Sequence, residues 1–192
     1  KRQDQWGGSA ENRMRFLLEI YKAVRAATSE QFIISVKLNS ADFQRGGITE
    51  EDVIATFKAI DAAGIDLIEI SGGSYEAPAM AGVKQEKRKA STIAREAYFL
   101  EFAEKIREQV QCKLMVTGGF RTAAGMNAAL ASGACDFIGM ARPFAVEPDV
   151  TNRLIAGQDV RYAVDKIKTG ISMIDKMAIM EVIWYAAQFK DI

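Results

Sequence analysis

Four short apolar runs alternate with longer amphipathic segments along this chain, and this alternation constrains its fold most strongly. The segments that join successive runs are longer than ten residues, so the runs are expected to pair as parallel strands joined by crossovers. The first run is β-branched and apolar almost throughout, as expected of a parallel strand covered on both faces. The strands are predicted at residues 32–39, 65–71, 113–119 and 136–140.

Helical spacing of apolar residues precedes, separates and follows these strands. Ser9 opens the first helix, Thr49 caps the second, and Gly64 is expected to end the second. The order is therefore one helix, four β/α units and a closing helix. The helices are predicted at residues 9–28, 49–63, 91–109, 122–132, 148–156 and 173–190.

The segments AAGIDLIEI and ASGACDFIG repeat the order helix, glycine, acidic residue and strand, which is typical of (β/α) barrels. A full TIM (β/α)8 barrel takes about 250 residues, whereas only four strands are countable among these 192. We therefore predict an α/β fold in which residues 1–192 form one domain. That domain is the C-terminal half of a TIM barrel, about its last four β/α units plus a C-terminal helix. Since the chain begins without methionine and inside an apparent loop, it is expected to be a fragment or a processed chain.

Composition restricts the classes of function open to the chain. Lys plus Arg equals Asp plus Glu at 25 each, so no basic field is available to attract nucleic acid or anionic lipid. No apolar run approaches the length of a membrane span, and we expect a cytoplasmic protein with no membrane partner. Histidine is absent, which removes the commonest general acid/base and metal ligand, and no metal site is expected. Cys112 and Cys135 lack metal-binding spacing and are expected to be buried, reduced thiols.

The last two predicted strands end alike, in VTGGFR and FIGMARP. Backbone N–H groups can approach phosphate oxygens only where side chains are small, which suits Gly118, Gly119 and Ala141. Arg142 or Arg121 can then add charge and a forked donor. For each loop alone, a tight turn that needs glycine only for positive φ is the alternative. The two loops together favour a phosphate site, because phosphates commonly bind TIM barrels after strands seven and eight.

Lys37 lies near the end of the run FIISVKLN, where a charge has little other reason to occur. Burying an ammonium group is costly unless an anion or acceptor meets it, so a ligand partner is expected. A lysine that extends to the rim of the barrel is the alternative.

Four segments, RQDQWGGSAENRMRF, VKLN, GGFR and MARP, resemble in this order the motifs of the Old Yellow Enzyme family of FMN-dependent NAD(P)H:flavin oxidoreductases and ene-reductases. The resemblance covers nearly the whole chain. It implies that the opening segment follows the fourth barrel strand and that Lys37 contacts the N1/O2 side of FMN. It also implies that Gly118, Gly119, Ala141 and Arg142 hold the FMN phosphate.

The resemblance further implies an enzyme that takes hydride from NADH or NADPH and passes it through flavin N5 to an activated alkene or related small-molecule acceptor. The family's His-Asn or His-His pair and its tyrosine proton donor belong upstream of the opening motif, so the catalytic residues are unknown here. We expect the chain alone to be inactive. It should pair with a missing N-terminal half-barrel or with a second copy, and a homo-oligomer is expected.

Two other functions stay open on the residues alone. A Schiff-base aldolase or a sugar-phosphate isomerase would use Lys37 as nucleophile and the two glycine/arginine loops to hold a substrate phosphate. A non-catalytic half-barrel would only bind phosphate or assemble. The loop from Gly73 to Lys89 follows the second predicted strand and is placed to shape substrate choice, but no residue in it identifies a substrate.

Overall fold

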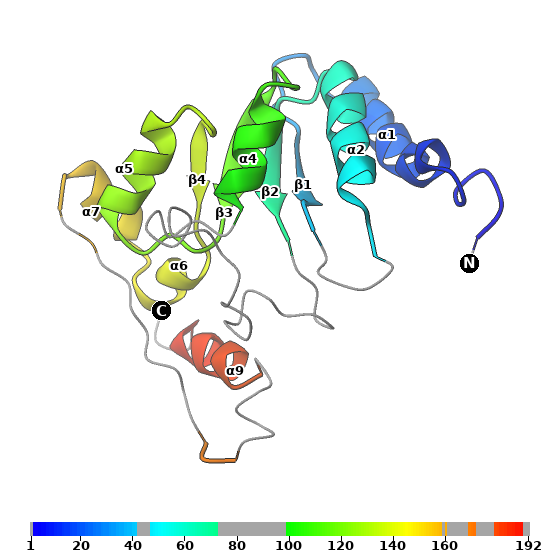
Figure 1. Ribbon diagram of the computed structural model, residues 1–192. Coiled ribbons are helices and arrows are strands. Elements are labelled where there is room, and N and C mark those ends of the chain that lie inside the picture. Colours follow the sequence, from blue (N-terminus) through cyan, green and yellow to red (C-terminus); the bar gives the residue numbers. More distant parts are fainter. Residues whose placement is uncertain are drawn as a thin grey trace.

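The computed structural model describes residues 2–41, 47–72, 99–158, 160, 169–171 and 179–189. Four parallel strands form one sheet in chain order, and Figure 1 shows them side by side in an open arc. The predicted parallel pairing is thus confirmed, although each strand is shorter than its apolar run. The strands are β1 (Ser35–Asn39), β2 (Leu67–Ser71), β3 (Lys113–Thr117) and β4 (Phe137–Gly139).

Three of the described helices begin after a residue whose side chain caps them. The hydroxyl oxygens of Ser9, Thr49 and Thr122 each accept a backbone N–H from the first turn, at 3.0–3.2 Å. Gly64 ends the second helix with φ of 94°, as predicted. The helices are α1 (Ala10–Ala27), α2 (Glu50–Ala62), α4 (Leu100–Arg107), α5 (Ala123–Ala131), α6 (Arg142–Val146), α7 (Val150–Ile155) and α9 (Ile179–Gln188).

Some predicted segments lie partly or wholly outside the described residues, and one observed helix was not predicted. The first part of the helix predicted at residues 91–109, and the loop from Gly73 to Lys89, lie outside the described residues. The described part of the closing helix is α9. The sequence did not predict α6, which directly follows β4 and, like α9, lies beyond the C-terminal ends of the strands (Figure 1).

The two faces of the sheet have different surroundings. Alternate strand residues pack against the helices in one core, whereas Ser35, Lys37 and Asn39 of β1 are exposed and Phe137 of β4 is half exposed. The expectation that the first strand is covered on both faces is therefore wrong for β1. The reason is that no other strand of the described residues faces this side of the sheet. The fully buried core side chains include Phe57, Ile60, Ile68, Ile70, Leu100, Ile106, Leu114 and Val116.

The opening segment forms a loop that its own polar side chains tie to α1. Asn12 Nδ2 donates to the Gly7 carbonyl at 3.1 Å, and Arg15 Nε donates to the Gln5 carbonyl at 3.0 Å. These bonds satisfy backbone acceptors ahead of the helix. The polar and glycine-rich composition of this segment therefore has a structural explanation.

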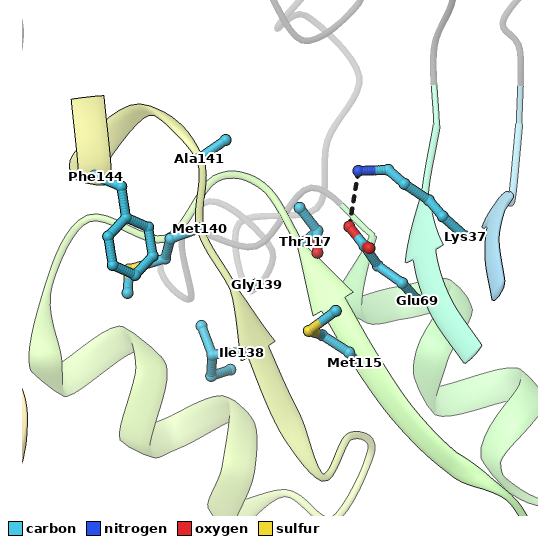
Figure 2. Close-up of a pocket in the computed structure, with 9 residues that line it drawn as sticks. All are labelled: Lys37, Glu69, Met115, Thr117, Ile138, Gly139, Met140, Ala141 and Phe144. Carbon is cyan, nitrogen blue, oxygen red and sulfur yellow. Dashed lines mark ion pairs between the residues drawn. The ribbon is translucent and has the colours of Figure 1, made fainter. Parts of the chain in front are cut away.

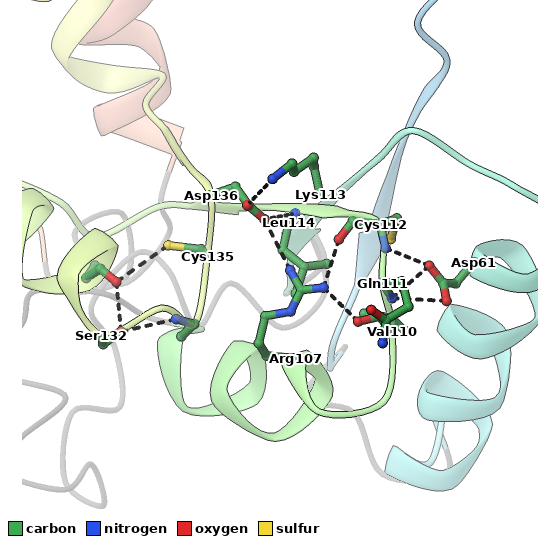
Figure 3. Close-up of polar contacts among 12 residues, drawn as sticks. Asp61, Arg107, Val110, Gln111, Cys112, Lys113, Leu114, Ser132, Cys135 and Asp136 are labelled. Carbon is green, nitrogen blue, oxygen red and sulfur yellow. Dashed lines mark hydrogen bonds and ion pairs between the residues drawn. The ribbon is translucent and has the colours of Figure 1, made fainter. Parts of the chain in front are cut away.

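A charged cluster fixes the N-terminal edge of the sheet, opposite the strand ends that the glycine loops follow (Figure 3). Asp136 accepts the backbone N–H of Leu114 at 2.9 Å and pairs with Lys113 at 2.8 Å and Arg107 at 3.1 Å. Burial alone would raise the pKa of Asp136, but the hydrogen bonds from Lys113 and Leu114 and the charges of Lys113 and Arg107 outweigh it and lower that pKa. This cluster lies at the N-terminal ends of the strands. In TIM barrels that end contributes to stability, whereas the active site lies at the C-terminal ends.

Both cysteines are free, as predicted, with Cys135 buried and Cys112 half-buried. Burial raises the pKa of Cys112 to about 12 and that of Cys135 to about 11. Neither is therefore an activated thiolate at neutral pH. In the part of the chain that the structure describes, no helix combines the length and the apolar character needed to cross a membrane.

Candidate functional site

The strand ends surround a hollow of about 320 Å³ on the open side of the sheet. Figure 2 shows side chains from all four strands and from the segment after β4 turned toward it. Its volume falls in the range of small-molecule sites, and it lies at the barrel end where such sites are built. The lining residues are Lys37, Glu69, Met115, Thr117, Ile138, Gly139, Met140, Ala141 and Phe144.

Lys37 is paired with a carboxylate of the neighbouring strand. It lies in register with Glu69 of β2, and its Nζ is 2.7 Å from Glu69 Oε1. The Lys37 side chain is 58% exposed, so it is not the buried cation that would require a ligand. This exposure agrees with the alternative in which the lysine extends to the rim of the barrel, and the Glu69 carboxylate is its anionic partner.

Glu69 is a site residue that the sequence reasoning missed. Its side chain is only 19% exposed and lines the hollow beside Lys37. The available signal was an acidic residue inside the apolar run IDLIEIS. That position predicts an inward-facing carboxylate, which is rarely buried without a partner.

Thr117 and Gly139 form the floor of the hollow between β3 and β4. The two residues are register partners, and a β-carbon on Gly139 would lie 2.8 Å from the Thr117 β-carbon. Thr117 Oγ1 is buried and has no hydrogen-bond partner among the described residues. Since a buried hydroxyl without a partner is costly, this oxygen is available to a ligand.

The glycines after β3 have the positive φ that the tight-turn alternative expects. Gly118 and Gly119 have φ of 104° and 93°, a region that other residues rarely adopt. The Gly118 N–H donates to the Gly139 carbonyl at 3.3 Å and so joins the two loops. Within the described ranges, the Gly119 N–H makes no hydrogen bond, which leaves it as the amide suited to an anion.

The segment after β4 forms one side of the hollow. Ala141 lines it directly, with Met140 and Phe144 as an apolar wall (Figure 2). Arg142 follows Ala141 as the first residue of α6 and does not line the hollow. Of the predicted site residues, Lys37 and Ala141 line the hollow, Gly118 and Arg142 adjoin lining residues in the chain, and Gly119 is two residues from Thr117. The arrangement suits a ligand that is partly apolar and carries negative charge.

The comparisons with known proteins point to one family. A family model described as NADH:flavin oxidoreductase / NADH oxidase family matches residues 1–160. The chain is 39% identical over 154 residues to the NADH-dependent flavin oxidoreductase iliE of Neonectria sp. (strain DH2), covering 77% of this chain and 20% of that protein. It is 36% identical over 163 residues to iliE of Hypocrea jecorina (strain QM6a), covering 84% of this chain and 40% of that protein. The chain thus spans well under half the length of these relatives.

Solved structures share the fold. A 2-naphthoyl-CoA reductase in complex with 2-naphthoyl-CoA superposes with a TM-score of 0.71 at 32% identity, covering 82% of this chain and 23% of that one. An old yellow enzyme homologue from Zymomonas mobilis superposes with a TM-score of 0.61 at 22% identity, covering 85% and 42%. The predicted fold, β/α units of a TIM (β/α)8 barrel, is confirmed by this agreement and by the parallel sheet.

Proposed function

The chain belongs to the NADH:flavin oxidoreductase / NADH oxidase family, and from this premise we propose that it forms the FMN-binding part of an NADH-dependent oxidoreductase acting on a small-molecule acceptor. The observation that carries this proposal is the hollow at the strand ends, which brings a lysine, an unpartnered hydroxyl and an apolar wall together. The finer proposal is that the acceptor is an activated alkene or a related compound.

The residues around the hollow fit FMN. The Lys37 ammonium supplies positive charge at the polar edge of a flavin ring, while Met140 and Phe144 offer apolar surface to the ring. Gly119 and Ala141 leave room for backbone N–H groups to approach a phosphate. The unpartnered Thr117 hydroxyl oxygen can donate its proton to a flavin acceptor or accept a ring N–H.

The chain's own contribution to the chemistry is binding, orientation and charge. Bound FMN supplies the hydride-transfer chemistry, which proteins do not supply by themselves. The positive charge of Lys37 would stabilise the flavin in those states in which the flavin carries negative charge. Since the 192 residues contain no histidine, we propose that proton delivery to the acceptor depends on groups outside them.

The open face of the sheet supports a second part of the proposal, that the complete barrel forms only with further chain. Side chains such as Lys37, Lys113 and Phe137 face this side and are at least half exposed. A barrel needs a facing half to fill its interior. We propose that an N-terminal half-barrel supplies it, because the relatives are far longer than this chain.

The lysine-nucleophile alternative has less support. A Schiff-base lysine is activated by desolvation or by a neighbouring cation. Lys37 has neither, because its side chain is 58% exposed and its nitrogen contacts the Glu69 carboxylate. Borohydride trapping of a carbonyl compound on Lys37 would revive this alternative.

The test uses the complete protein that carries this sequence. We expect a yellow protein with bound FMN that oxidises NADH, and Arg142→Gln should weaken FMN binding at least about tenfold, since it removes a charged phosphate contact. Arg153→Gln is the matched control, because Arg153 lies in α7 and pairs with Glu147 away from the hollow. Absence of FMN, or equal loss in both variants, would contradict the proposal.

A further inference from the structure

Lys37 and Glu69 form the one ion pair of the described residues in which both partners line the hollow. They belong to adjacent strands and lie in register, so the sheet itself holds them together. Figure 2 shows the two side chains turned toward each other and joined by an ion pair. A ligand in the hollow that pairs with the Lys37 ammonium therefore does so beside the Glu69 carboxylate.

The burial of the two side chains is unequal. Glu69 is 19% exposed and Lys37 is 58% exposed, so the carboxylate has lost more water than the ammonium. On the other side of Glu69, its register partner is Met115, whose thioether cannot donate a hydrogen bond. Among the residues that the structure describes, Glu69 thus depends on Lys37 for a counter-charge, whereas Lys37 is open enough to be solvated by water.

We propose that Glu69 is a positioning residue that holds the Lys37 ammonium at the flavin edge and sets the net charge presented there. This inference rests on the proposed function, because it assumes that the ligand is FMN. While Glu69 is ionised, the pair is nearly neutral, and Lys37 stabilises added negative charge on the flavin less than a lone cation would. Glu69 thereby keeps the reduction potential of the bound flavin low.

The reduction potential of FMN in the complete protein tests this role, because a purely structural glutamate would not change it. Glu69→Gln keeps the shape of the side chain and removes its charge. We expect the two-electron reduction equilibrium to shift about tenfold toward reduced flavin, which corresponds to about 30 mV. Lys37→Gln should shift it in the opposite direction.

Two further variants separate charge from shape. Glu69→Asp retains the charge and should keep a potential near that of the unmodified protein. The double variant Lys37→Gln/Glu69→Gln is again neutral and should return close to the unmodified value. If Glu69→Gln does not fold, the difference between Lys37→Gln and the double variant measures the same contribution, since it also removes only the Glu69 charge.

The outcomes distinguish this inference from the proposed function. If FMN binds and Lys37→Gln lowers the potential, but removal of the Glu69 charge changes nothing in either background, the role of Glu69 is overturned and the function stands. If the unmodified protein binds no FMN, as measured by flavin fluorescence on titration, both are overturned.

Discussion

Gly139 of β4 lies so close to Thr117 of β3 that a β-carbon on Gly139 would overlap the Thr117 hydroxyl oxygen and lie 2.8 Å from its β-carbon. The Gly118 N–H, which donates to the Gly139 carbonyl, adds a second link between the two strand ends. These contacts make the two loops one unit. The similar endings of the two strands therefore have a packing explanation in addition to any ligand.

Gly139→Ala should destabilise the complete protein by about 1–3 kcal/mol, because the added methyl group would clash with the Thr117 side chain. Urea unfolding followed by circular dichroism measures the change. Adding Thr117→Ala removes the overlapping oxygen and should recover part of the loss. A single variant as stable as the unmodified protein would show that the two strands can separate at this point.

Thr117→Val should have opposite effects on the free protein and on FMN binding. Valine has nearly the same shape as threonine, and it replaces a buried hydroxyl that has no partner in the described structure. Without ligand, the variant should gain about 1 kcal/mol in the free energy of unfolding, and its FMN affinity should fall several-fold.

Thr56→Val is the matched control for Thr117→Val. The Thr56 hydroxyl donates to the Asp52 carbonyl at 2.8 Å, so its removal breaks an existing bond. This control should lose stability slightly and keep its FMN affinity. Equal effects of the two substitutions on stability and affinity would argue against a ligand role for Thr117.

Local features of the sequence predicted most of the fold. The capping hydroxyls of Ser9 and Thr49 and the glycine at 64 act within one helical turn, so their effect is readable from the residues alone. Strand ends were less predictable. Residues 32–34 belong to the first apolar run but precede β1, because its pairing with β2 starts only at Ser35.

The parts of the site that were missed depend on contacts between distant residues. Glu69 became a site residue through its register with Lys37, and register between strands is not encoded locally. The five-residue helix α6 was missed because it is too short to show helical periodicity. Lys37 lines the hollow but is more than half exposed, and this exposure was not predictable because it depends on what faces the sheet.

Asp136→Asn should lower the free energy of unfolding at neutral pH and weaken the dependence of that free energy on pH. The pKa of Asp136 is lowered in the folded state, so its contribution is present above the unfolded pKa, about 3.9, and is lost as the pH falls through the folded value. The expected loss at pH 7 is about 1–3 kcal/mol, because Arg107 and Lys113 lose their counter-charge and asparagine offers one acceptor oxygen in place of two.

Thermal unfolding between pH 7 and pH 2 measures this effect. Asp149→Asn is the control, because Asp149 is exposed and its side chain makes no capping hydrogen bond to α7. It should leave the pH profile unchanged. If both variants show the acid dependence of the unmodified protein, the cluster shown in Figure 3 contributes little to stability.

Removing an apolar side chain from α1 should reduce self-association of the isolated chain and lower the stability of the complete protein. Phe16, Ile20 and Val24 follow one another at four-residue spacing and are exposed, and α1 lies at one end of the arc of strands (Figure 1).

If the N-terminal half-barrel covers this stripe, Phe16→Ser should reduce self-association of the isolated chain in sedimentation velocity. The same change should destabilise the complete protein by about 2–4 kcal/mol, since a buried aromatic ring is lost. Glu19→Ser, an exposed position on the same helix, should do neither. A monomeric isolated chain, together with unchanged stability of the complete protein, would show that this face stays open.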